Sequence, residues 1–87
     1  MNKEQVFEIL SGELHYQDTS QGHLDRILSV EEELLMIEYN VSLVRKQLEQ
    51  NRGDEKCLEK LRIAAACAVR CFENHGCPPR QINRHNV

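Results

Sequence analysis

The sequence predicts an all-α protein: an antiparallel hairpin of two long helices, preceded by a short N-terminal helix. Two apolar stripes support this prediction, because each repeats at alternating steps of four and three residues, which is the spacing of one helical face. The first stripe comprises Val30, Leu34, Ile37, Val41, Val44 and Leu48, and the second comprises Leu58, Leu61, Ala65, Ala68 and Phe72. The turn signal Asn-Arg-Gly-Asp at 51–54 separates them. We expect the two stripes to pack against each other along the seam of the hairpin.

The N-terminal helix is predicted from a capping box and an apolar face. Asn2 is followed three residues later by Gln5, as in a capping box. The residues that share one helical face are Val6, Phe7, Leu10 and Leu14. The polar stretch 17–22 predicts a loop, and residues 23–28 suggest one further helical turn.

The ends of the two long helices carry clearer signals. Ser29 and Glu32 form a second capping box, so the first long helix is expected to run from there to about residue 50. Asp54 is expected to cap the second long helix, which should continue to about residue 75. Gly76 fits the C-terminal cap, and the two prolines at 78–79 prevent continuation.

The bulk composition limits the size and the function of the chain. At 87 residues, with a net charge of −3, we expect one helical domain at 1–78 and a polar tail at 79–87. The negative charge argues against a nucleic-acid binder, since phosphate neutralisation needs a basic face. No stretch is apolar enough to span a bilayer, and the first residues lack the apolar run of a signal peptide. We therefore expect a cytoplasmic protein without a membrane partner.

A second apolar face on the first long helix predicts a further packing partner. Met36, Tyr39 and Leu43 lie nearly opposite the predicted seam at 100° per residue. The N-terminal helix is one candidate to cover this face, through Phe7 and Leu10, and a second protomer is another. We favour a homodimer that forms a helical bundle, with the N-terminal helix contributing.

Acidic residues on the first long helix suggest one candidate site. Glu31 and Glu38 are seven residues apart and share one flank of the helix. Carboxylates that line a helical bundle can hold Mg²⁺, which prefers oxygen ligands. The alternative interpretation is a solvated, salt-bridged face whose first turn complements the helix dipole.

Cysteine and histidine residues near the end of the second long helix suggest another site. Cys71, His75 and Cys77 form a three-ligand set for zinc if the chain folds back after Gly76. The alternative is that Cys57 and Cys71 act as small core residues while His75 complements the helix dipole.

The chain resembles a group of short proteins encoded by bacteriophages and prophages. The resemblance covers most of residues 13–80 and lies in three segments. These are Tyr16-Gln17-Asp18, Ser29-Val30-Glu31-Glu32, and the stretch from Leu61-Arg62 through Ala64-Ala65 to Cys71-Phe72-Glu73-Asn74-His75-Gly76 with Pro79-Arg80. It implies a bacterial host cell and a host or phage protein as partner.

More distantly, the helical pair is similar to the all-α nucleotide pyrophosphohydrolases of the MazG type. This resemblance implies a helical oligomer that binds nucleoside triphosphates through Mg²⁺. The best ligand candidates under it are Glu31, Glu32, Glu38 and, across the hairpin, Glu59. The chain departs from the metal motifs of that family, because Met36 replaces the third Glu of Glu-Glu-x-x-Glu and Arg62 replaces the Asp of Glu-x-x-Asp.

We therefore favour a non-catalytic protein that acts through protein–protein contacts and needs no cofactor. The alternative is a nucleotide-binding or nucleotide-hydrolysing relative of the MazG type, for which Mg²⁺ is the cofactor. A fold shared with enzymes does not by itself imply their activity.

Overall fold

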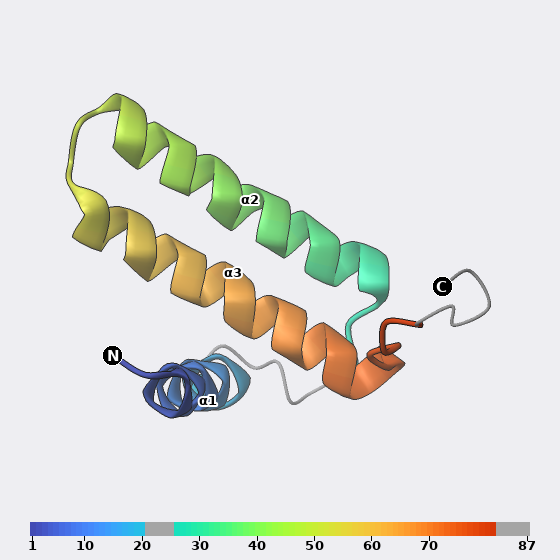
Figure 1. Ribbon diagram of the computed structural model, residues 1–87. Coiled ribbons are helices and arrows are strands. Elements are labelled where there is room, and N and C mark those ends of the chain that lie inside the picture. Colours follow the sequence, from blue (N-terminus) through green and yellow to red (C-terminus); the bar gives the residue numbers. More distant parts are fainter. Residues whose placement is uncertain (21–25, 82–87) are drawn as a thin grey trace, which may run out of the picture.

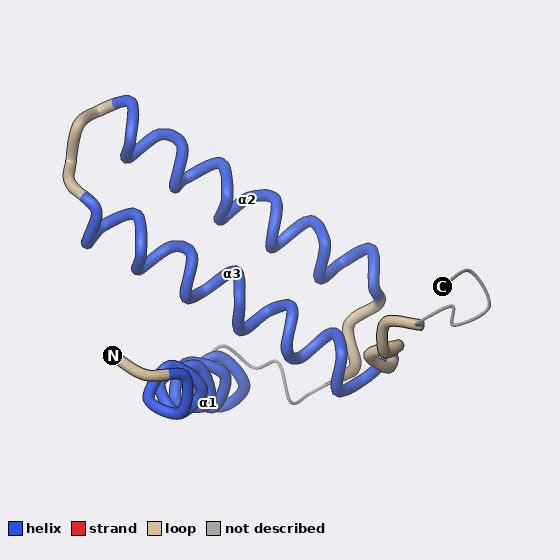
Figure 2. The backbone as a smooth tube through the Cα atoms, viewed as in Figure 1, coloured by secondary structure: helices blue, strands red, loops and turns tan. Residues whose placement is uncertain are grey.

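The computed structural model describes residues 1–20 and 26–81, and these form three helices and no strand. The helices are α1 (Lys3–Ser20), α2 (Val30–Glu49) and α3 (Asp54–His75). Helices α2 and α3 run antiparallel as a hairpin, and α1 crosses α3 at a steep angle (Figures 1 and 2). The predicted all-helical fold with its two-helix hairpin is confirmed.

Helix α1 is longer than the sequence predicted. The capping box is present, since the backbone N–H of Asn2 donates to Gln5 and that of Gln5 donates to Asn2, each at 2.8 Å. However, residues 17–20 belong to the helix and not to a loop, because no glycine interrupts them and the Gln17 side chain donates to Glu13 at 2.8 Å. The predicted turn at 23–28 is not helical at 26–28, and residues 23–25 lie outside the described residues.

Helix α2 begins as predicted, and α3 begins one residue earlier than predicted. The Ser29–Glu32 capping box is complete. The expectation that Asp54 caps α3 is wrong: Gly53 is the capping residue, Asp54 is the first helical residue, and no side chain caps this end. Gly53 has a φ of 89°, a conformation that glycine adopts without a steric penalty. The tight turn before α3 therefore places glycine, and not aspartate, at the capping position. Gly76 ends α3 as predicted, with its N–H bonded to the carbonyl of Phe72.

The predicted seam of the hairpin is right only in part: Ile37, Val44, Ala65 and Ala68 of the two stripes are half-buried, but the most buried positions lie about one residue, or about 100°, away on each helix. The buried residues of α2 are Glu33 and Asn40, and those of α3 are Cys57, Ala64, Ala66, Cys67 and Arg70. Large members of the predicted stripes are instead about half exposed, for example Leu34 at 50% and Leu58 at 61%. The small side chains of Ala64 and Cys67 allow close approach, and an ion pair between Glu33 and Arg70 fixes the rotation.

Helix α1 covers a side of α3 and does not cover α2. Among the described residues α1 packs against α3 and has no packing contact with α2. The suggestion that Phe7 and Leu10 cover the second face of α2 is therefore wrong, and Phe7 is 57% exposed. Leu10 and Leu14 are half-buried. Only part of the apolar face of α1 therefore packs against another helix of this chain.

Candidate interaction surface

The interior of the protein is organised around the buried guanidinium of Arg70. Its Nε donates to Glu33 Oε1 at 2.8 Å and its Nη2 donates to Glu33 Oε2 at 3.2 Å. Its Nη1 donates to Gln17 Oε1 at 2.9 Å, so one side chain joins all three helices. Burial lowers the pKa of Arg70, but the hydrogen bond and charge of Glu33 outweigh it and hold that pKa above its usual value. The three side chains therefore fix how the helices are rotated against each other.

Two further side chains border this ion pair. Asp18 Oδ1 lies 3.5 Å from Arg70 Nη1 without the geometry of a hydrogen bond, so it adds charge but little directional bonding. The Cys67 thiol donates to Gln17 Oε1 at 3.6 Å. Burial raises the pKa of Cys67, and the positive charge of Arg70 offsets only part of this effect. Cys67 therefore stays a neutral thiol and acts as a small core residue.

A second polar contact joins α1 to α3 nearer the surface. Glu13 accepts a hydrogen bond from Arg62 Nε at 3.0 Å, and Gln17 Nε2 lies 3.3 Å from the carbonyl of Ile63. Arg62, which the resemblance to the MazG type sets against the Asp of that motif, pairs with a carboxylate of α1. Both carboxyl oxygens of Glu33 accept from Arg70 in the same way, so these carboxylates are already occupied by arginines.

The four glutamates proposed for Mg²⁺ are not brought together. Glu31 and Glu38 are exposed on α2, and Glu59 is half-buried on α3, with Lys56 Nζ 3.9 Å from its carboxylate. Glu32 caps α2 and pairs with Arg26. The hydrogen bond from Arg26, with that from the Ser29 backbone, lowers the pKa of Glu32 to about 2.

The zinc ligands proposed near the end of α3 are also apart. Cys71 is half-buried and Cys77 is exposed. The Nε2 of His75 donates to the carbonyl of Leu28 at 2.7 Å, which ties the segment before α2 to the end of α3. Within residues 1–20 and 26–81, no three His, Cys, Asp or Glu side chains are grouped so that they could hold a metal ion.

An apolar face covers one side of the hairpin, and we call it the outer face. It consists of Val30, Leu34, Val41, Leu48, Leu58, Leu61 and Phe72, each of which is 43–61% exposed. On each helix these residues are offset from the buried side by about one residue in the direction of increasing number, as Leu34 follows Glu33 and Leu58 follows Cys57. Because the helices are antiparallel, equal offsets of this kind turn both stripes to the same side of the hairpin.

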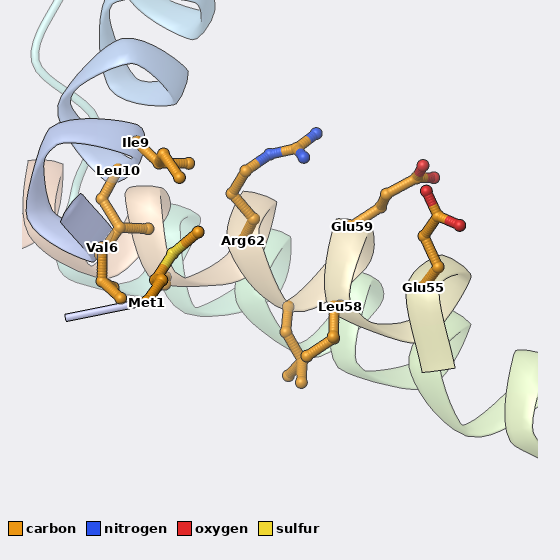
Figure 3. Close-up of a pocket in the computed structure, with 10 residues that line it drawn as sticks. Met1, Val6, Ile9, Leu10, Glu55, Leu58, Glu59 and Arg62 are labelled. Atoms are coloured by element: carbon orange, nitrogen blue, oxygen red, sulfur yellow. The ribbon is translucent and has the colours of Figure 1, made fainter. Parts of the chain in front are cut away.

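A groove between α1 and α3 continues the outer face. Its volume is about 540 Å³. Leu58, Leu61 and Ala65 of α3 line one wall, and the beginning of α1 lines the other through Met1, Val6, Ile9 and Leu10. Figure 3 shows Met1, Val6, Ile9 and Leu10 together at the start of α1, with Leu58 further along α3, while Arg62 and Glu59 point to the opposite side of α3 from Leu58.

The three residues predicted to form an interface lie elsewhere on α2. Met36 and Leu43 are half-buried at the edge of the hairpin, whereas Tyr39 is 64% exposed. These three therefore present less free apolar surface than the outer face does.

Sequence reasoning missed the buried polar residues, although one signal was available. Glu33, Asn40 and Gln47 follow each other at steps of seven, so they mark one line along α2 that is as regular as the apolar stripe. Polar residues at heptad core positions are known to fix register at a cost in stability. No comparable signal pointed to Gln17 or Arg70, because their partners are more than 35 residues away in the chain.

Comparison with known proteins gives no family assignment: no family model, no curated protein and no solved structure matches the chain. Within the described residues, none of the three helices combines the length and apolar character needed to cross a membrane.

Proposed function

We propose that this chain is a non-catalytic interaction protein whose hairpin binds the helices of another protein chain through its outer face. One observation carries the proposal: seven large apolar side chains, 43–61% exposed, lie on one side of two packed helices. A contiguous exposed apolar face is typical of protein interaction sites and is uncommon on proteins that remain monomeric.

The arrangement of polar groups supports the same proposal. The buried charges of Arg70 and Glu33 are paired with each other, so neither is available to bind a substrate. The exposed apolar side chains, in contrast, gain free energy only when another surface covers them. The outer face is therefore the surface whose burial by a partner would contribute favourable free energy of binding.

The kind of partner follows from the sequence. Because the chain resembles phage and prophage proteins, we propose that it acts on a phage or bacterial-host protein, or on another copy of itself. The heptad spacing of the outer face is the spacing by which helices pack in bundles, so the contacting element of the partner is a helix.

Site-specific photo-crosslinking tests this proposal in bacterial cells that produce the protein. A photoreactive residue replaces Leu34 or Leu58 in the outer face, and Lys46, exposed on another side of α2, is the control position. We expect a discrete protein adduct from the two face positions and none from position 46. Equal labelling from all three positions, or no adduct from the face, would contradict the proposal. The mass of the adduct also shows whether the partner has the mass of a second copy of the chain or a different mass.

A further inference from the structure

We infer that a second copy of this chain covers the outer face, with a two-fold axis that passes beside Val41 of α2 and Leu61 of α3. The inference rests on the proposed function, because it names the occupant of the same face. Three features of the chain place the axis at this level, and a fourth supports the presence of a second copy.

The first feature is a row of charges beside the outer face of α2. Glu31, Glu38 and Arg45 of α2 follow each other at steps of seven, Arg52 follows seven residues later in the turn beyond the end of α2 at Glu49, and all four are exposed. In the described part of the chain none of them has an ion-pair partner. Two acids followed by two bases form a row that complements itself when a second copy runs in the opposite direction.

The register of that complement can be read from the numbers. Antiparallel pairing of α2 with its copy places Glu38 opposite Arg45 of the second copy, a pair centred between residues 41 and 42, and it brings Glu31 to the end of the second copy's α2, which precedes the turn that carries Arg52. Two-fold symmetry repeats the Glu38–Arg45 pair, so two opposite-charge pairs form between the two copies of α2. Antiparallel helices that pack through heptad positions bring such flanking charges together and use them to choose partner and orientation.

The second feature is the apolar stripe of α2 itself. Leu34 and Leu48 each lie seven residues from Val41, which is about 10.5 Å along the axis. An axis beside Val41 therefore places Leu34 against Leu48 of the second copy and Val41 against its own equivalent. The charged residues and the apolar residues of α2 therefore place the two-fold axis at the same position along the helix, to within about one residue.

The third feature is the apolar stripe of α3. Contacts between α2 and α3 show which residues of the two helices lie at the same level. The Cys57 thiol approaches the carbonyl of Val44, and Arg70 pairs with Glu33, so Leu61 lies at about the level of Val41. An axis at this level places Leu61 against its own equivalent and Leu58 against the small Ala65 of the second copy. Large and small side chains then alternate, as close packing between helices requires.

The fourth feature is the amount of surface that one copy leaves uncovered. Its accessible surface is 7050 Å², whereas a folded monomer of 10.1 kDa is expected to expose about 5,300 Å². The exposed residues 76–81 account for part of the difference. The radius of gyration is 15.4 Å, against about 12 Å for a compact chain of this length. A stable dimer hides roughly 800 Å² per partner, and the seven residues of the outer face, each 43–61% exposed, are the apolar surface available for it.

Charge reversal at one pair of positions tests the register. Arg45→Glu and Glu38→Arg each create like-charge pairs in the dimer, whereas the double variant exchanges the charges and restores all pairings. By sedimentation equilibrium at low salt, we expect each single variant to raise the dimer Kd about tenfold or more and the double variant to return it to within about threefold. Lys46→Glu, on another side of α2, should leave the Kd unchanged. A double variant as weak as the two singles combined would overturn the register.

Disulfide cross-linking tests the position of the axis directly. In a Cys77→Ser background, which removes the exposed thiol, Val41→Cys should form a covalent dimer on mild oxidation. Leu34→Cys alone should not, because its equivalents would lie about 21 Å apart, but a mixture of Leu34→Cys and Leu48→Cys chains should. Efficient self-linking of Leu34→Cys would overturn the inference.

Failure of this inference and failure of the proposed function give different results. A chain that sediments at its monomer mass, but whose outer face cross-links to a different protein, overturns the second copy and leaves the proposed function standing. A chain that stays monomeric and gives no adduct from the face overturns both.

Discussion

The interior of the hairpin and its outer face use the same two helices in opposite ways. Inside, α2 places Glu33 and Asn40 against the small residues of α3, and an arginine completes the packing. Outside, the same helix places Leu34, Val41 and Leu48 toward solvent. A row of large apolar side chains on the hairpin is therefore left open by its own chain.

This difference separates two physical tasks. A buried ion pair contributes little net stability compared with a hydrophobic contact, but it tolerates few rotations of the helices, so it specifies their register. An apolar face contributes free energy of association in proportion to the apolar area that binding removes from water. In this chain the interior sets the geometry of the protomer, and the outer face supplies the free energy for association.

The largest effect is expected from breaking the interior. Arg70→Met leaves the carboxylate of Glu33 buried without its partner, because Glu33 is fully buried and both its oxygens accept from Arg70. We expect the free energy of unfolding to fall by about 3–5 kcal/mol, measured by urea denaturation followed by circular dichroism.

A double variant sharpens this test. Glu33→Leu combined with Arg70→Met removes both charges, so most of the lost stability should return. Lys46→Met, at an exposed position of α2, should change the free energy of unfolding by less than about 0.5 kcal/mol. If the double variant is as unstable as Arg70→Met alone, the ion pair is not what makes the single change costly.

A smaller effect is expected at the start of α2, which supports the interior and the outer face equally. Ser29→Ala removes the hydroxyl that accepts from the Glu32 backbone N–H, at 3.1 Å. We expect a loss of about 1 kcal/mol in the free energy of unfolding, measured in the same way, with the Kd of self-association unchanged at temperatures where the chain stays folded. A change in that Kd comparable to the change in stability would mean that the two surfaces are not separable.

The sequence predicted the elements well and their rotation poorly. Capping residues such as Ser29 and Gly76 act on their immediate neighbours, so local rules found the ends of the helices. The rotation of α2 depends on Arg70, which lies 37 residues from Glu33, and no local rule connects them. The heptad stripe was a true helical signal, but periodicity does not say whether the covering helix belongs to the same chain or to another.

The candidate sites show the same limit. The proposed Mg²⁺ and Zn²⁺ residues were chosen from spacing along a helix and from a resemblance to another family, and neither shows which side chains the neighbouring helices contribute. Glu32 pairs with Arg26, and His75 bonds to the carbonyl of Leu28, so each already has a structural partner. The outer face was visible in the sequence as a stripe, yet we predicted that it would be hidden in the seam.

The most direct test of this account is the mass and helix content of Leu34→Glu. If Leu34 lies on the outer face, the charge stays in solvent within one protomer and enters the contact between two. Sedimentation equilibrium with circular dichroism should then give a folded chain at the monomer mass of about 10 kDa, where the unchanged protein gives twice that mass. An unfolded chain would place Leu34 in the seam of the hairpin, and a folded dimer would show that the outer face is not where the copies meet.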